Sequence, residues 1–292
     1  MILKLKPIFY EKVWGGDKLN TQYNYDCSKK TGEAWGISAH KNGSSIITNT
    51  VHKGKTLREL YKSNRELFGN YTLDEFPILI KVIDANKDLS IQVHPDDRYA
   101  RKHEDSLGKT ECWYILDTEP NTNIVIGHNA KSLDEFKKHV KNNDFESIIN
   151  RFPINKKDSF NIYAGTIHAI CKGTLLLEIQ QSSDVTYRLY DYNRLSNGRL
   201  RELHLDKALD VIKFPDSILA KEKPKHLFDF HILNNQGVSE HRSDKFGDYI
   251  FIINGEGQFN NINVKKGDFL IVTSNDDYLI NGNIEYFKSK IA

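Results

Sequence analysis

A short strand-like segment, Ser90-Ile-Gln-Val-His-Pro-Asp96, carries two side chains that can bind a metal ion. Side chains alternate along a strand, so Gln92 and His94 project from the same face. Burying a polar group without a partner costs about 1–3 kcal/mol, so this pair needs partners. It is either a hydrogen-bonded pair on a half-exposed strand or part of a metal site.

Two further segments contain candidate metal ligands. Glu111 follows Lys109 in Gly108-Lys-Thr-Glu-Cys-Trp-Tyr114, and His168 follows a glycine turn in Tyr163-Ala-Gly-Thr-Ile-His168. Two histidines, a carboxylate and an amide oxygen suit a borderline divalent metal such as zinc, although manganese or iron would also be tolerated. The chain has 11 histidines, so residue type alone does not select these two.

The segment from Leu177 to Arg194 contains candidate anion-binding residues. Glu178 lies on a strand otherwise made of Leu and Ile, and Arg188 and Arg194 follow among aromatic residues. A guanidinium group binds phosphate through a planar fork of donors, which favours recognition of an anion. The alternative is a solvated loop with surface ion pairs.

Strands must position these residues, because most of the chain consists of short β-branched runs bounded by turn formers. The predicted strands are 44–51, 76–83, 89–94, 112–116, 123–127, 159–163, 173–180, 249–253 and 263–272. Such close spacing favours a sandwich or barrel. Thr56 with Glu59 and Ser132 with Glu135 are typical of capping boxes, which predicts a helix after each. A helical insertion is expected at about 131–150, and another short helix at 207–213.

Composition excludes several classes of protein. The 292 residues include 41 Lys and Arg against 39 Asp and Glu, a net charge of +2, so we expect no nucleic-acid partner. Segment 1–7 lacks the apolar run of a signal peptide, and no stretch approaches the roughly 18 apolar residues of a membrane span. The only cysteines, Cys27, Cys112 and Cys171, argue against a disulfide framework and for a cytoplasmic location.

Four ordered motifs together resemble the type I mannose-6-phosphate isomerases in their short bacterial form. These motifs are Gln92-Val-His-Pro-Asp96, the segment 108–114, Ala164-Gly-Thr-Ile-His-Ala169, and the segment 178–194. Segment 32–38 resembles the N-terminal strand region of that family. The resemblance implies a mainly β, cupin-type jelly-roll barrel with short helical insertions. It also implies reversible conversion of mannose 6-phosphate to fructose 6-phosphate, with this sugar phosphate as the partner and the oligomeric state left open.

The resemblance also implies roles for ten residues. One zinc ion per chain is expected on Gln92, His94, Glu111 and His168. The catalytic residues are expected to be Arg188, Lys109 and Glu178. The phosphate end of the pocket is expected to contain Ser90, Lys81 and Arg194. The chain departs from the long form of the family at Gly108, where that form has a histidine.

The charged stretch at 221–225, which contains a proline, predicts a linker between a catalytic cupin domain, 1–220, and a smaller cupin-like β domain, 226–292. The turns at 255–257 and 267–268 resemble a second cupin unit. No histidine follows them, and His241 alone supplies no metal site, so this domain is expected to be metal-free. Two alternatives stay open: a cupin oxidoreductase that uses iron, and a sugar-binding cupin without catalysis.

Overall fold

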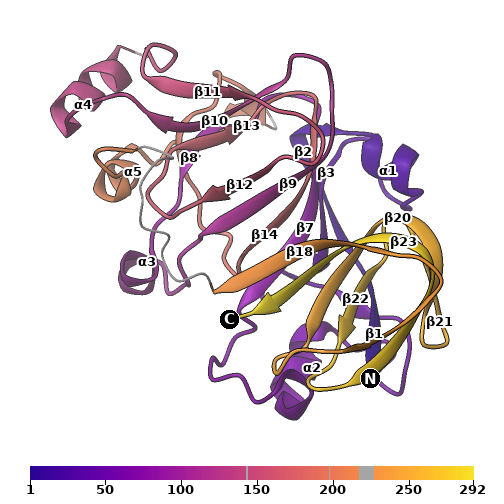
Figure 1. The fold of residues 1–292 in the computed structure, drawn as a ribbon. Helices are drawn as coiled ribbons and strands as arrows, with labels where there is room; N and C mark the ends of the chain where they lie inside the picture. Colours follow the sequence, from indigo (N-terminus) through magenta and orange to yellow (C-terminus); the bar gives the residue numbers. More distant parts are fainter. Residues whose placement is uncertain (143, 197, 217–226) are drawn as a thin grey trace.

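Three antiparallel β-sheets dominate the computed structural model, which describes residues 1–142, 144–196, 198–216 and 227–292 (Figure 1). The sheets have eight, six and five strands, and the short helices lie at their margins. The mainly β architecture predicted from the strand spacing is confirmed. In the described part of the chain, no helix is long and apolar enough to cross a membrane.

The six-stranded sheet is the middle layer. Its strands, in spatial order, are β12 (Ser159–Ile162), β9 (Glu111–Thr118), β14 (Thr174–Gln181), β7 (Ile78–Ala85), β2 (Ile8–Gly16) and β3 (Thr31–Ile37). Strands β7 and β14 are buried along their whole length. One face of the sheet is apolar, with Ile80, Val82 and Leu177 in the largest hydrophobic cluster, and the other face holds Lys81 and Glu178.

The five-stranded sheet faces the polar side of this middle layer. It consists of β11 (Ile149–Pro153), β10 (Asn123–His128), β13 (His168–Ile170), β8 (Ile91–Val93) and β15 (Tyr187–Tyr190). Its outer face packs against α4 (Leu133–Lys141) and α5 (Leu205–Val211), with α3 (Asp97–His103) nearby (Figure 1). Phe136 of α4 and Ala208 of α5 share one apolar cluster with Ile91 and Val93, which leaves the inner face of the sheet for Gln92.

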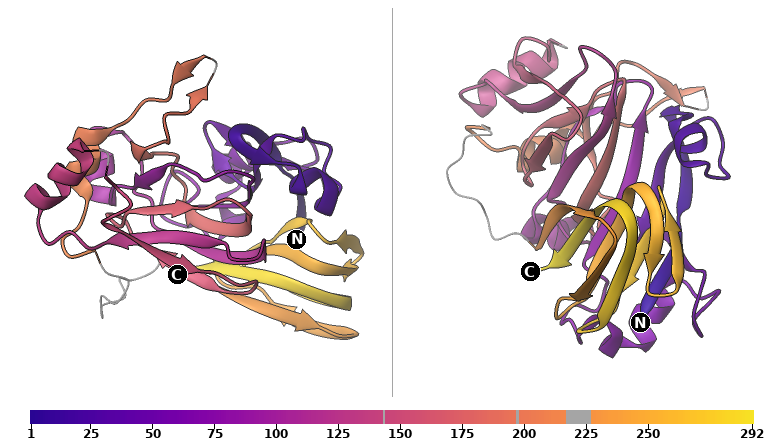
Figure 2. Two further views of the ribbon diagram at one scale, coloured as in Figure 1. Left: turned by 90° about the horizontal axis from the view of Figure 1, so that it is seen from above. Right: turned by 45° about the vertical axis from the view of Figure 1, so that its right-hand side comes forward.

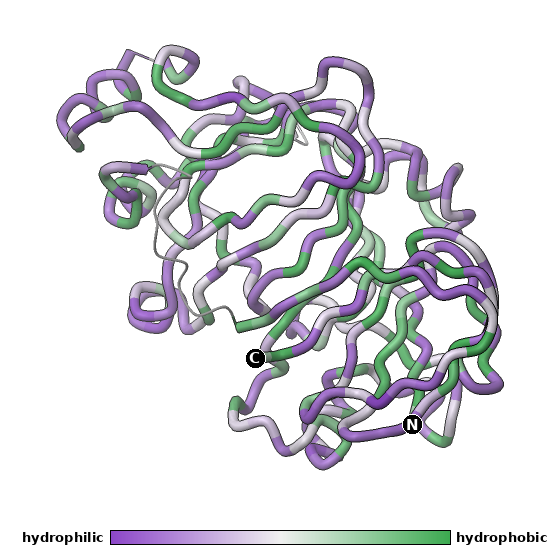
Figure 3. Tube along the Cα trace, viewed as in Figure 1, coloured by the Kyte–Doolittle hydropathy of each residue, from purple (hydrophilic) through white to green (hydrophobic). Residues whose placement is uncertain are grey.

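The eight-stranded sheet covers the other face of the middle layer (Figure 2). Its main path is β18 (Phe228–Asn235), β23 (Asp277–Ile291), β20 (Asp248–Phe259), β22 (Phe269–Val272), β1 (Ile2–Lys6) and β6 (Ile46–Ile47). Two more strands, β19 (Val238–Arg242) and β21 (Ile262–Lys265), pair with β23 and β20. Side chains alternate along β20: Tyr249 and Phe251 pack toward the middle layer, whereas Ile250 and Ile252 pack in a separate cluster. In Figure 3, hydrophobic residues, in green, run along strands of the sheets, whereas α4 at the upper left is mostly hydrophilic.

This sheet crosses the predicted domain boundary. Leu5 of β1 pairs with Phe269 of β22, so residues from the first fifty positions complete a sheet built mainly from residues after 226. The division into 1–220 and 226–292 stays a prediction, and the predicted linker at 221–225 lies outside the described residues.

Local structure confirms some of the predicted elements and corrects others. Thr56 and Glu59 form the predicted capping box at α2 (Leu57–Ser63). Ser132 caps α4, but that helix ends at Lys141, so the helical insertion is shorter than the predicted 131–150. Segment 44–51 is not one strand. The remaining elements are α1 (Lys18–Tyr23), the 3-10 helix η1 (Arg65–Phe68), the hairpin of β4 (Ala39–His40) and β5 (Gly43–Ser44), and the hairpin of β16 (Leu195–Ser196) and β17 (Arg199–Leu200).

Candidate active site

Three buried side chains converge between the six-stranded and five-stranded sheets. His94 follows β8, Glu111 begins β9 and His168 begins β13. Nε2 of His94 lies 3.1 Å from Nε2 of His168 and 3.2 Å from Oε1 of Glu111. Lys109 places its ammonium group 2.9 Å from the same carboxylate oxygen. The ligand atoms of the two histidines and Glu111 all lie within 4.8 Å of one another.

This donor set fits a divalent metal ion. Nδ1 of His168 lies 2.9 Å from the carbonyl oxygen of Thr166, and donation to it leaves the Nε2 lone pair directed toward His94. Two imidazole lone pairs at 3.1 Å repel unless a proton or a cation lies between them. Burial lowers the pKa of both histidines, that of His94 to about 3, so both rings are uncharged at neutral pH and each can offer a lone pair to a cation. A metal cation satisfies both rings.

Strand register extends this cluster across the five-stranded sheet. Gln92 of β8 pairs directly with His168 of β13 on one side and with Arg188 of β15 on the other. Side chains of directly paired residues lie on the same face of a sheet. Gln92 and Arg188 therefore extend into the same cavity, beside the histidines.

Glu178 is the buried carboxylate on the opposite wall. It lies between Lys81 of β7 and Trp113 of β9 in the register of the six-stranded sheet. The indole nitrogen of Trp113 donates to Oε1 at 2.8 Å, and the ammonium group of Lys81 lies 2.6 Å from Oε2. Burial and the charge of Glu111 raise the pKa of Glu178 to about 7, even though Lys81 opposes this shift.

A second buried carboxylate, Glu33 of β3, lies between two lysines. Its oxygens are 3.2 Å from Nζ of Lys12 and 3.9 Å from Nζ of Lys81. Burial alone would raise the pKa of Glu33, but the charges of Lys81 and Lys12 lower it to about 2. Glu33 is therefore ionised at every pH at which the protein is expected to work.

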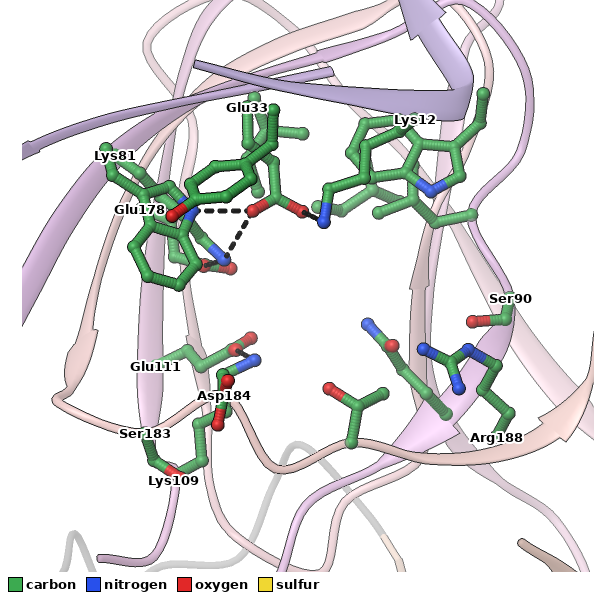
Figure 4. Close-up of a pocket in the computed structure, with 18 of the residues that line it drawn as sticks. Lys12, Glu33, Lys81, Ser90, Lys109, Glu111, Glu178, Ser183, Asp184 and Arg188 are labelled. Carbon is green, nitrogen blue, oxygen red and sulfur yellow. Dashed lines mark hydrogen bonds and ion pairs between the residues drawn. The ribbon is translucent and has the colours of Figure 1, made fainter. Parts of the chain in front are cut away.

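Most of these groups line one cavity of about 250 Å³, enough for a small polar molecule, and the buried His94 and His168 reach it through their contact with Glu111. Figure 4 shows Glu111 and Lys109 on one side, with Arg188 and Ser90 across the cavity from them. The cavity thus combines Glu111 of the metal-binding trio, a carboxylate with a pKa near neutrality, and a guanidinium group.

Comparison with known proteins identifies the family. Residues 2–139 match the model of the phosphomannose isomerase type I catalytic domain. The Bacillus subtilis protein named "probable mannose-6-phosphate isomerase GmuF" is 42% identical over 289 residues, which span 97% of this chain and 89% of that protein. The chain belongs to the type I phosphomannose isomerase family. The crystal structure of the mannose 6-phosphate isomerase from Bacillus subtilis is 40% identical, covers 99% of both chains and has a TM-score of 0.94.

A more distant phosphomannose isomerase structure shares the fold. It is 16% identical, covers 99% of both chains, has a TM-score of 0.75, and was solved with zinc and yttrium bound. At this identity the likeness shows the fold alone. Together with the Bacillus subtilis structure it confirms the predicted cupin-type, mainly β fold class of the phosphomannose isomerases.

Gly108 is where the sequence departs from the long form of the phosphomannose isomerases, and the backbone explains this residue. A Cβ atom at position 108 would lie 2.5 Å from backbone atoms of Asp96 and Asp97. The amide of Gly108 also donates to the Asp97 carboxylate at 2.9 Å. The local backbone therefore leaves no room for a side chain here, and Lys109 is the first residue of this segment that lines the cavity.

The structure places most of the predicted site residues together. Those that line the cavity are Lys81, Ser90, Gln92, Lys109, Glu111, Glu178 and Arg188. The buried His94 and His168 lie against Glu111. Arg194 is not among the lining residues. It pairs with Asp191 and donates to the carbonyl oxygen of Asp88.

Four charged lining residues were missed by the sequence analysis: Lys12, Glu33, Asp184 and Arg201. The sequence held a signal for Lys12 and Glu33, because each lies two positions from an aromatic residue on the same face of a strand. Lys12 lies between Tyr10 and Trp14, and Glu33 precedes Trp35. Arg201 follows a charged, exposed hairpin, and no pattern distinguished it from a surface residue.

The three cysteines are free thiols. Cys112 and Cys171 are buried and free, and Cys27 is free and half-buried. Cys112 packs in the apolar cluster between the middle and eight-stranded sheets, on the face opposite Glu111. None of the three thiols joins the metal-binding trio.

Proposed function

We propose that this chain interconverts mannose 6-phosphate and fructose 6-phosphate in this cavity, which is the reaction of its family. The observation that supports this proposal is the convergence of a metal-binding trio, Glu178 and Arg188 on one cavity of sugar-phosphate size. The reaction moves a carbonyl group between C1 and C2, which requires removing a proton from one carbon and returning it to the other.

We propose one zinc ion per chain, held by Gln92, His94, Glu111 and His168. When bound, such an ion supplies a Lewis acid that stabilises negative charge on the sugar oxygens. The register pairing of Gln92 with His168 supports the amide as the fourth ligand. The ammonium group of Lys109 adds a second positive charge close to Glu111.

Glu178 is the strongest candidate for the proton-transferring group. A carboxyl group with a pKa of about 7 exists in both protonation states at neutral pH, so it can accept a proton and return it. The hydrogen bond from Trp113 orients this carboxyl group. Lys109 is the other candidate acid, because its ammonium group also lines the cavity.

The phosphate end of the cavity is proposed at Arg188 and Ser90, across from the lysine–carboxylate pairs (Figure 4). Lys81, also predicted for this end, already contacts Glu178 and Glu33. We therefore propose that Lys81 positions Glu178 through their ion pair.

The cytoplasmic location remains a prediction that rests on the three cysteines.

A coupled assay with mannose 6-phosphate, run before and after chelation, tests this function. We expect isomerisation that is lost on metal removal and restored by one equivalent of zinc per chain. Full activity in a metal-stripped sample would contradict the metal proposal. Oxygen consumption without isomerisation would instead support a cupin oxidoreductase, and zinc and sugar binding without turnover would support a non-catalytic cupin.

A further inference from the structure

The positive charges around the cavity differ in whether a carboxylate neutralises them. Lys12, Lys81 and Lys109 each lie within 3.2 Å of a glutamate oxygen. In the described part of the chain, the guanidinium group of Arg188 has no ion-pair partner, and its buried Nε makes no hydrogen bond. Unneutralised positive charge therefore remains at one end of the cavity.

Arg201 belongs to this same end. It lines the cavity, and its side chain is only 19% exposed. Nη1 of Arg201 lies 3.2 and 3.3 Å from the two oxygens of Asp191. Within the described ranges, Nε and Nη2 of Arg201 have no hydrogen-bond partner, which leaves one edge of the guanidinium group free. Arg201 and Arg188 line the same cavity, and the charge of Arg201 lowers the pKa of Arg188.

Asp191 is a buried anchor for two arginines. Its side chain is 4% exposed and pairs with both Arg201 and Arg194. Arg194 is held further by the carbonyl oxygen of Asp88 and by the ring of Tyr192, 5.1 Å from its guanidinium carbon. Two arginines share one carboxylate here, so a net positive charge remains beside Arg188.

We propose that Arg201 binds the phosphate group of the substrate together with Arg188, and that Asp191 positions Arg201 for this contact. The inference rests on the proposed isomerase function and adds to it a residue that selects phosphorylated over unphosphorylated sugar. A phosphate dianion complements two adjacent guanidinium groups through charge-assisted hydrogen bonds. In this proposal Arg194 forms an ion pair with Asp191 and does not contact the substrate.

The test compares Arg201→Ala and Arg201→Lys with Arg199→Ala, an exposed arginine in the hairpin just before Arg201. We expect Arg201→Ala to raise KM for mannose 6-phosphate on the order of 10–100-fold, with kcat and zinc content nearly unchanged. Competitive inhibition by inorganic phosphate should weaken by the same factor. Arg201→Lys keeps a charge for Asp191 and should give a smaller rise, whereas Arg199→Ala should match the wild type.

Asp191→Asn tests the positioning role. We expect it to raise KM without changing kcat, and to add little in the Arg201→Ala background, because both changes remove one contact. A purely structural role would instead lower thermal stability and leave KM unchanged. KM and phosphate inhibition of Arg201→Ala within twofold of Arg199→Ala would overturn the inference.

Calorimetric titration with inorganic phosphate separates this inference from the proposed function. If the wild type does not isomerise mannose 6-phosphate, the proposed function fails. Weaker phosphate binding by Arg201→Ala would still support the anion site, whereas unchanged binding would overturn it.

Discussion

The pKa and the orientation of Glu178 depend on its surroundings. Burial and the charge of Glu111 raise its pKa, while Lys81 and Trp113 hold its carboxyl group in place. Glu178→Gln keeps the shape and removes the transferable proton. We expect kcat to fall roughly 10²–10⁴-fold, the usual contribution of a general acid or base, with zinc content retained. Glu202→Gln, at an exposed position, is the control. Steady-state kinetics with less than a tenfold change would assign proton transfer to another group.

The paired histidines predict a metal-dependent phenotype. His168→Ala removes one of three converging ligands, so most zinc and most isomerase activity should be lost while the protein stays folded. Elemental analysis and circular dichroism measure the two outcomes separately. His241→Ala is the matched control, because His241 lies in the eight-stranded sheet, where its ring contacts Ser239 and Tyr278 and does not line the cavity. Normal zinc content in His168→Ala would rule this residue out as a ligand.

The ion pairs of Glu33 make the stability of the fold depend on pH. Its pKa in the folded chain, about 2, lies below the ordinary 4.5. Ionised Glu33 therefore stabilises the fold above about pH 4.5, by about 3 kcal/mol, and this contribution disappears as the pH falls toward 2. The difference in unfolding free energy between the metal-free wild type and Glu33→Gln should shrink between pH 6 and pH 3. A difference that stays constant would contradict the ion-pair assignment.

The sequence predicted the site residues that lie within motifs and missed those that lie outside them. Gln92 and His94 could be found from alternation on a short strand, and Glu111 from its motif beside Lys109. Arg201 could not, because a guanidinium group reaches the cavity only through its pairing with Asp191, ten positions away. Arg194 was predicted instead, since it is the last residue of the motif 178–194. The difference between the two arginines is a tertiary contact.

At the scale of elements, strand β3 packs against β22 through one close approach. A Cβ atom on Gly36 would lie 2.2 Å from the ring of Phe269. Gly36→Ala should destabilise the protein by about 1–3 kcal/mol through overpacking. In the Gly36→Ala background, Phe269→Leu should cost less than it does alone, because it makes room for the methyl group. Chemical denaturation of the four variants measures this coupling, and strict additivity would contradict it.

Elements with strong local signals were predicted well. The capping box at Thr56 and the buried runs of β7 and β14 need no distant partner to be recognised. The prediction of one strand at 44–51 was wrong, because the chain turns at Ser45. The hydroxyl group of Ser45 donates to the carbonyl oxygen of Gly36 in a neighbouring layer. Local propensity is overridden where a side chain bonds another layer.

At the scale of the whole molecule, the three sheets depend on one another. The eight-stranded sheet covers the apolar face of the middle layer, where Ile80, Val82 and Leu177 pack with Tyr249 and Phe251. A fragment of residues 1–216 would expose that face and leave β1 without β22. We expect the fragment to aggregate and to lack isomerase activity, measured by size-exclusion chromatography beside the full chain. A monomeric, cooperatively unfolding fragment would instead support an independent catalytic domain.

The pairing of β1 with β22 also has a consequence for synthesis of the chain. Lys4 and Asp268, which form an ion pair beside these strands, are 264 positions apart. During translation, the apolar Ile2, Leu3 and Leu5 therefore emerge from the ribosome long before their partners exist. An unpaired strand of this kind is prone to aggregation, and contacts so distant in sequence form slowly. We infer that the nascent chain depends on chaperones until its last quarter has been made.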